Sequence, residues 1–213
     1  MKANRLIDDF NDGYIEPKKW GTAVSGGGFT SVEGGGIVTL TVAPSTVGYA
    51  RIFSIRSDMD MTSSFMQAEL TKSNGTTVDS AMKFFANYPT NTNVLYVVLS
   101  GSNITAVKVV AGVSENVLQT TYNATDMAYL RMRESAGIWY WDYSSDGYTW
   151  INLTSLSPIP FAIDRGQIMF ECSEYAIDAA ATSMTVDDFN VGQNFIVPKN
   201  NIRPAFFTPG RAR

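Results

Sequence analysis

The stretch YLRMRESAGIWYWDYSSDGYTW, residues 129–150, decides the fold of this chain because it predicts two consecutive β-hairpins. Leu130 and Met132 alternate with more polar neighbours at a period of two, which is typical of a half-buried strand. Ala136-Gly137 can form the first turn. Asp146-Gly147 predicts the second turn, because a type I′ turn needs a positive φ at both central residues.

A two-residue loop at 136–137 also predicts the register of the first hairpin. It places apolar residues opposite one another on one face, and charged and aromatic residues on the other. The expected pairs are Met132 with Trp141, Leu130 with Tyr143, Arg133 with Tyr140, and Arg131 with Asp142. A slip by one residue mixes the two faces, so the pattern favours this register, with the indole-rich side in the core.

Composition sets the class of protein. The chain has 213 residues, of which 45% are hydrophobic and 17% charged, so we expect one globular core. The net charge of −4 gives no reason to expect binding to nucleic acid. Zinc chemistry and a Ser-His-Asp triad are not expected because the chain has no histidine. The single cysteine, Cys172, lies in an apolar run and is interpreted as a buried thiol.

Neither a signal peptide nor a membrane-spanning stretch is recognisable, so we expect synthesis in a cytoplasm and no membrane insertion. No window predicts a useful amphipathic helix. Short segments with period-two patterns, separated by Gly, Asn, Asp and Pro, instead predict an antiparallel β-sandwich. The expected strands lie near residues 4–10, 36–43, 48–55, 64–71, 80–88, 93–100, 103–111, 115–122, 127–134, 138–144, 147–152, 166–175 and 182–191. Residues 94–99, VLYVVL, are apolar on both faces, which indicates a central or covered strand.

The two ends of this sandwich carry the same four residues. The sequence Asp-Asp-Phe-Asn occurs at 8–11 and again at 187–190. We expect the first and last strands to lie side by side with each Phe pointing inward. The carboxylates of Asp8, Asp9, Asp187 and Asp188 then form either a calcium site, because calcium takes oxygen ligands, or a solvated strand edge. No other cofactor is expected.

Residues 192–213 differ from the sandwich domain at 1–191 because they contain three prolines and few alternating positions. We interpret them as an extended C-terminal arm. Its apolar residues predict docking on a partner or on a neighbouring copy, and packing against its own domain is the alternative. The docking residues proposed are Phe195, Ile202, Phe206 and Phe207.

At the level of pattern, residues 5–191 resemble the concanavalin A-like lectin and glucanase jelly rolls, among them laminin-G-like and DUF1349-like domains. The resemblance rests on the opening Asp-Asp-Phe-Asn-Asp with Trp20, the Leu-Arg-Met-Arg strand, the YSSDGYTW segment at 143–150 and the closing MTVDDFNV at 184–191. It implies two stacked antiparallel sheets, one of them concave and often used to bind carbohydrate. The ending from Arg203-Pro204 to Ala212-Arg213 is similar to the tail ends of some tailed-bacteriophage structural proteins.

Together these resemblances lead us to expect a non-enzymatic virion protein, attached through its arm to other virion proteins or to copies of itself. The sandwich is then available for host-surface glycans. The alternative is a glycoside hydrolase or a free carbohydrate-binding module. Glucanases of the superfamily carry Glu-x-Asp-x-x-Glu on one strand. The nearest pair here, Glu171 and Glu174, has a spacing that places the two side chains on opposite faces.

The polar side of the first hairpin is our candidate carbohydrate surface. It consists of Tyr129, Arg131, Arg133, Tyr140 and Asp142. Sugars are held by aromatic faces and by planar hydrogen-bonding groups, and these residues offer both. A solvated cross-strand charge ladder with no ligand is the alternative interpretation.

Overall fold

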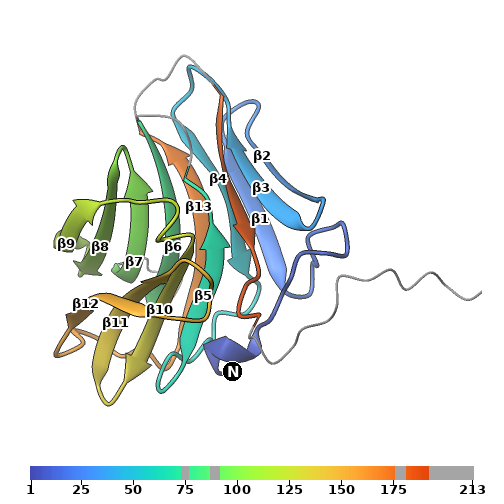
Figure 1. The fold of residues 1–213 in the computed structure, drawn as a ribbon. Helices are drawn as coiled ribbons and strands as arrows, with labels where there is room; N and C mark the ends of the chain where they lie inside the picture. The colour runs from blue at the N-terminus through green and yellow to red at the C-terminus, as the bar shows by residue number, and fades with distance from the viewer. Residues whose placement is uncertain (73–76, 87–91, 176–180, 192–213) are drawn as a thin grey trace, which may run out of the picture.

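The computed structural model describes residues 1–72, 77–86, 92–175 and 181–191 (Figure 1). The C-terminal arm predicted at 192–213, with the docking residues Phe195, Ile202, Phe206 and Phe207, lies outside the described residues. Its docking stays a prediction. The described chain is an all-β, antiparallel jelly-roll sandwich of two seven-stranded sheets.

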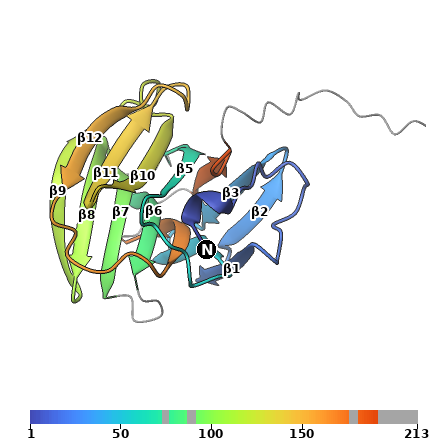
Figure 2. The ribbon, with the colours of Figure 1, turned by 90° about the horizontal axis from the view of Figure 1, so that it is seen from below.

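The two sheets are stacked, and their strands are far apart in the sequence (Figures 1 and 2). The first sheet has the order β1 (Trp20–Ser25), β4 (Gly48–Ser54), β13 (Gly166–Glu174), β6 (Val78–Ala86), β7 (Asn93–Ser100), β8 (Asn103–Val110) and β9 (Val113–Thr121). The second has the order β12 (Ile151–Leu156), β11 (Ile138–Ser144), β10 (Tyr129–Ser135), β5 (Phe65–Leu70), β14 (Thr182–Asp187), β3 (Ile37–Val42) and β2 (Thr30–Gly34).

The first hairpin has the predicted register. Strands β10 and β11 pair Met132 with Trp141 and Arg131 with Asp142, and the other two expected pairs also form. Ala136 and Gly137 have φ values of 54° and 80°, as a type I′ turn requires. The indole-rich side faces the core, because Trp139 is 0% and Trp141 1% exposed.

The core between the sheets contains aromatic rings contributed by both ends of the chain. Trp20 lies 5.9 Å from Phe10 and 5.2 Å from Phe189 between ring centroids, and both phenylalanines are fully buried. The ends of the described chain meet, because the Asp8 amide donates to the Phe189 carbonyl at 3.0 Å. The prediction that the two Asp-Asp-Phe-Asn segments adjoin is therefore confirmed.

Three details of the strand prediction are wrong. Strand β1, Trp20–Ser25, is not among the expected strands. Residues 4–10 form no strand: a short 3-10 helix covers Ala3–Arg5, and the contact with Phe189 is an isolated bridge. Residues 147–152 do not follow a two-residue turn either, since β12 begins only at Ile151. The intervening loop closes on Asp146, which accepts hydrogen bonds from the amides of Tyr148 and Thr149, both at 2.7 Å. An aspartate that accepts hydrogen bonds from backbone amides stabilises a longer loop, and the Asp146-Gly147 dipeptide alone does not distinguish that loop from a two-residue turn.

Two further predictions, on β7 and on Cys172, are confirmed. Strand β7 has hydrogen-bonded neighbours on both sides, β6 and β8, so it is a central strand, and Val94 and Val98 on its outer face are also buried. Cys172 is fully buried, and burial raises the pKa of its thiol to about 12. Within the described residues, no helix has the length and apolar character that crossing a membrane requires.

Candidate functional site

The outer face of the first sheet, away from the core, holds the candidate site. Alternation along β6, β7 and β13 sends every second side chain to this face. Several of these residues are nevertheless buried, among them Ala81, Val98, Met169 and Glu171, as is Val107 on the neighbouring β8. The middle of this face is therefore shielded from solvent, which strengthens the interactions between its polar groups.

A doubly paired carboxylate lies at the centre of this face. Glu171, on β13, is 7% exposed. Its Oε1 lies 2.6 Å from Nζ of Lys83 on β6, and its Oε2 lies 2.6 Å from a guanidinium nitrogen of Arg51 on β4. Burial alone raises the pKa of a carboxyl group, but here the two cations outweigh it, so the pKa of Glu171 is lowered. Glu171 is thus held ionised.

A second carboxylate, Asp79, lies on the same face of β6. Asp79 is paired with Ser173, two residues from Glu171, so the two acids are diagonal neighbours. Such neighbours lie ~7–8 Å apart. Burial raises the pKa of Asp79, and the hydrogen bond from Ser100 only partly opposes this effect. Its Oδ1 is buried and has no hydrogen-bond partner among the described residues.

The pKa values of the two carboxyl groups are therefore shifted in opposite directions. The pKa of Asp79 is raised and that of Glu171 is lowered, although both lie on the same shielded face. Two acids whose pKa values differ in this way can act as a proton donor and as an anion within one reaction. Glycoside hydrolysis uses a proton donor and a carboxylate in this way, with their carboxyl groups about 5–9.5 Å apart.

Aromatic rings border the carboxylates. Arg51 stacks on Tyr49 with its guanidinium carbon 3.3 Å from the ring centroid, and the Lys83 ammonium lies 5.4 Å from that of Tyr96. Tyr96 also packs against the small apolar cluster of Ala81, Val98 and Val107. Aromatic and apolar surface beside hydrogen-bonding groups is suited to the faces and hydroxyls of sugar rings.

The carbohydrate surface predicted from the sequence lies on the second sheet instead. Asp142 is buried, and its Oδ2 accepts from Arg131 at 2.8 Å and from Arg133 at 2.7 Å. Arg131 stacks on Trp150 at 4.1 Å and Arg133 on Tyr140 at 3.9 Å.

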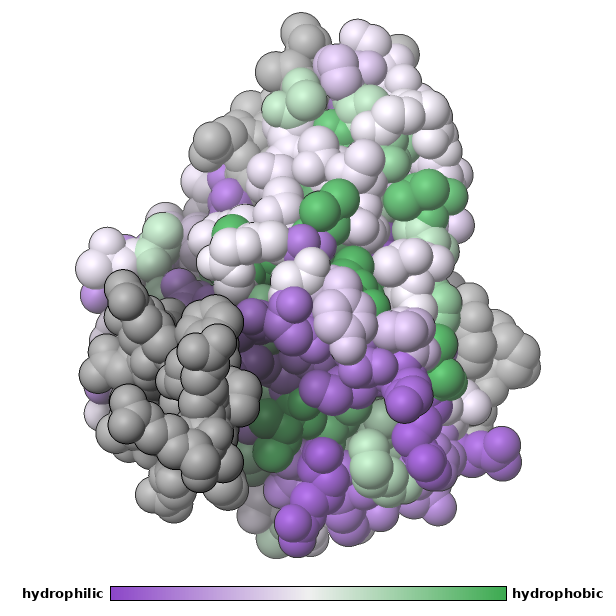
Figure 3. All heavy atoms as spheres, turned by 90° about the vertical axis from the view of Figure 1, so that its right-hand side faces the viewer, coloured by the Kyte–Doolittle hydropathy of each residue, from purple (hydrophilic) through white to green (hydrophobic). Residues whose placement is uncertain are grey.

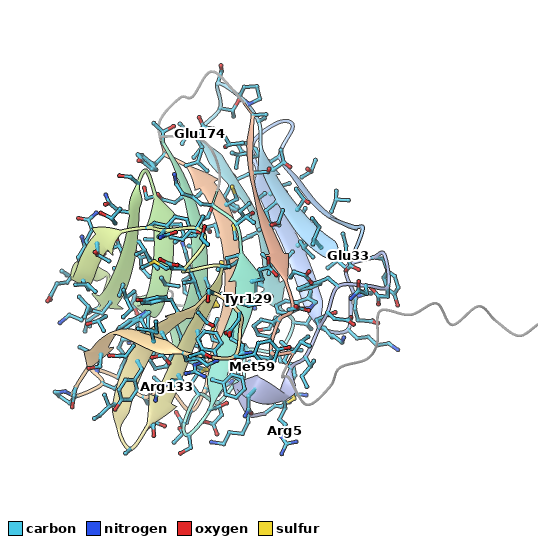
Figure 4. All side chains as sticks on the ribbon, viewed as in Figure 1. Arg5, Glu33, Met59, Tyr129, Arg133 and Glu174 are labelled. Carbon is cyan, nitrogen blue, oxygen red and sulfur yellow. The ribbon has the colours of Figure 1, made fainter. Side chains whose placement is uncertain are left out.

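The fifth residue of this surface, Tyr129, is hydrogen-bonded to Glu69. Figure 4 shows Tyr129 and Arg133 on β10. The five residues thus lie together as predicted, with both guanidinium groups already paired. Carbohydrate binding on this surface stays a prediction.

The predicted calcium ligands do not form one group. Asp8 accepts from Nε1 of Trp20 at 2.9 Å and pairs with Lys19 at 3.2 Å, so the N-terminal half of the set is engaged elsewhere. Asp187 and Asp188 are instead grouped with Glu69 on β5. The sequence repeat predicted that the two ends adjoin. It could not reveal Glu69, because β5 is brought to β14 only by the sheet.

Sequence reasoning placed Glu171 and Glu174 correctly on opposite faces, since Glu174 points inward and is 2% exposed. It missed Asp79, Lys83 and Arg51 as partners of Glu171. One signal was available: Asp79 and Lys83 are charged residues four apart in an otherwise apolar strand, which places both on one face. The pairing of β6 with β13 is a contact between segments far apart in the sequence, and no sequence pattern predicts it.

No family model matches the chain. No curated protein matches it either. Several solved structures, in contrast, match most of the chain. The catalytic domain of an endo-1,3-β-glucanase (laminarinase) from Thermotoga petrophila RKU-1 has a TM-score of 0.65 and 11% identity over 86% of this chain and 94% of that one. A β-1,3-1,4-glucanase (lichenase) from a mouse hindgut metagenome has a TM-score of 0.65 and 11% identity over 86% and 96%. A Bacillus licheniformis β-glucanase has a TM-score of 0.62 and 12% identity over 86% and 94%.

These matches establish the concanavalin A-like jelly-roll fold implied by the sequence resemblance. They contradict the expectation of a non-enzymatic virion protein, because the structures that share the fold over most of both chains are enzymes that cleave β-glucans. That expectation rests on a short basic segment at the C-terminus, whereas the shared fold covers 86% of the chain.

Proposed function

We propose that the protein is a glycoside hydrolase that holds a β-linked glucan against the outer face of the first sheet. The observation that carries this proposal is the pair of carboxyl groups, Asp79 and Glu171, on neighbouring strands with pKa values shifted in opposite directions. The glucanase likeness supports the substrate class.

In this mechanism Asp79 is the general acid. Its raised pKa keeps the carboxyl group protonated to a higher pH, so it can donate a proton to the glycosidic oxygen as the bond breaks. Glu171 is the carboxylate that faces the positive charge developing on the sugar ring. Lys83 and Arg51 keep it ionised and fix its position. A water molecule forms the new bond to the anomeric carbon, and the proton that it releases returns to Asp79. The chemistry uses these carboxyl groups and needs no cofactor.

The proposal is tested with the full chain and soluble 1,3-β-glucan and mixed-linkage 1,3-1,4-β-glucan, by measuring released reducing ends. Asp79→Asn and Glu171→Gln are each expected to lower the rate by about 100-fold or more, because a positioned acid or base contributes roughly 10²–10⁴-fold. Glu115→Gln is the matched control. Glu115 lies on β9 of the same sheet and pairs with Lys108 at 3.1 Å.

Two results would overturn the proposal: a wild-type rate no higher than that of Asp79→Asn on either glucan, or an unchanged rate in both variants. Glu171→Gln leaves two cations without their partner, so its folding is checked by thermal melting. Asp79→Asn keeps the shape of a group that already has a raised pKa, and it separates loss of chemistry from loss of fold. Glucan binding by Asp79→Asn, followed by affinity electrophoresis, is expected to persist.

A further inference from the structure

A cavity that is widely open to solvent lies at the edge of the sandwich. It has a volume of about 600 Å³ and lies between β1 and β2, which are the edge strands of their respective sheets. The segment preceding β1 and Ile55, just after β4, form the rest of its wall. Figure 3 shows this side of the molecule, and hydrophilic residues gather over its lower half. Glu33, at the end of β2, lines this cavity and is labelled in Figure 4, well apart from Tyr129 on β10.

Glu33 is the carboxyl group of this cavity and is 8% exposed. Its Oε1 accepts the Gly13 amide at 2.9 Å, and its side chain shares a hydrogen bond with Asp12. Gly13 has a φ of 82°, a conformation that lets this amide face the carboxylate and that a side chain makes costly. Burial and the neighbouring Asp12 raise the pKa of Glu33 to about 7.

Negative groups dominate the surroundings of Glu33. Asp12 and Asp8 both act on it, and Glu16 accepts a hydrogen bond from the Tyr14 hydroxyl at 3.2 Å. Lys19 is the neighbouring cation, and it pairs with Asp8 at 3.2 Å. No cation is paired with Glu33 itself among the described ion pairs and hydrogen bonds. Two ionised carboxylates cannot hydrogen-bond to each other, so the hydrogen bond between Asp12 and Glu33 requires a proton. A cation bound between the two groups would neutralise the same charge.

The walls of the cavity are largely apolar. Ile15, Pro17, Val32 and Ile55 line it together with the ring of Tyr14. Val32 is 56% and Ile55 50% exposed, which is unusual for such side chains beside one another. An apolar cavity with a few convergent polar groups has the composition of a small-molecule site.

We propose that this cavity binds a small organic cation, with an alkylammonium head between Glu33 and Asp12 and an alkyl body against Val32, Ile55 and the Tyr14 ring. The incoming cation replaces the proton shared by the two carboxyl groups. Below pH 7, where Glu33 holds its proton, one ligand therefore enters as one proton leaves, and the charge in the cavity is unchanged. This site is separate from the carboxylates on the outer face of the first sheet, and it does not rest on hydrolysis.

The test uses n-butylammonium chloride and the full chain, with the amide signals of Gly13 and Val32 followed by NMR. Butyrate and 1-butanol are the anionic and neutral controls of similar size. Butylammonium is expected to shift these signals at pH 8, and its affinity should be about tenfold weaker at pH 6, because the fraction of ionised Glu33 falls by about that factor across pH 7. Calorimetry at pH 6, where Glu33 still holds its proton, should show proton release in two buffers of different ionisation enthalpy.

Glu33→Gln should weaken binding at least about tenfold and remove its pH dependence, whereas Glu115→Gln should change neither. Asp12→Asn, in an exposed loop, is a second variant that leaves the buried carboxyl group in place, and it should also weaken binding. Equal binding of butylammonium and 1-butanol would overturn the proposal, as would unchanged affinity in Glu33→Gln. Absence of any shift in the Gly13 and Val32 signals would overturn it too.

Discussion

At the scale of single residues, Asp142 shows how burial turns a surface pattern into a structural requirement. From the sequence it is one partner of a cross-strand ion pair. In the structure its carboxylate is 3% exposed and serves both Arg131 and Arg133, and its Oδ1 accepts from Asn152 at 3.1 Å. Burial lowers the pKa of Arg131, because removing a charged guanidinium group from water is unfavourable. The ion pair with Asp142 partly offsets this effect.

Asp142→Ala is therefore expected to destabilise the protein by about 3–5 kcal/mol, the typical effect of removing one partner of a buried ion pair. Urea unfolding measures this free energy. Asp58→Ala is the control, because its carboxylate is 46% exposed and its pairing with Arg56 is a surface contact worth about 1 kcal/mol or less. Equal losses in the two variants would show that the network around Asp142 contributes nothing beyond a surface pair.

At the scale of elements, the hairpin of β10 and β11 is fixed by its turn and by its two faces. The register follows from the apolar alternation, and the turn must then place Ala136 and Gly137 at positive φ. Alanine is strained at its φ of 54°, because its Cβ approaches the backbone. The register set by the strands thus places Ala136 at a positive φ, a conformation that alanine does not favour.

Ala136→Asn should relieve that strain and raise the unfolding free energy by about 1 kcal/mol, because Asn tolerates the left-handed region and is favoured in type I′ turns. Chemical denaturation gives the change. Ala124→Asn is the matched control: this exposed residue is not among those with positive φ, so the same substitution should gain nothing there. A gain of equal size at Ala124 would contradict the argument from strain.

At the scale of the whole molecule, Glu33 at the edge of the sandwich makes the stability of the fold depend on pH. The pKa of Glu33 is about 7 in the folded protein, against an ordinary value of 4.5. The folded chain therefore holds a proton that the unfolded chain releases between these values. This contribution to stability is complete below pH 4.5 and is lost as the pH rises through 7.

The wild-type protein should accordingly lose stability between pH 5 and pH 8, and Glu33→Gln should flatten that slope, while Glu115→Gln keeps it. Thermal melts across this range measure the difference. The range is chosen because Asp58 and Asp146, whose pKa values are lowered to about 2 by hydrogen bonds, remain ionised throughout it. A slope unchanged in Glu33→Gln would show that this carboxyl group titrates normally.

The sequence by itself determined the local features: the β class, the register of β10 with β11, the burial of Trp139 and Cys172, and the meeting of the two Asp-Asp-Phe-Asn segments. The first three follow from periodicity, turn chemistry or hydrophobic burial within a short stretch, and the last follows from a four-residue motif that is repeated at the two ends. Only the tertiary structure decided that Glu171 of β13 meets Lys83 of β6 and Arg51 of β4, and that Glu33 meets Asp12 across an open edge. These contacts join residues 21 to 120 positions apart through strand order, and a periodicity of two fixes the face of a side chain but not the strand that lies beside it.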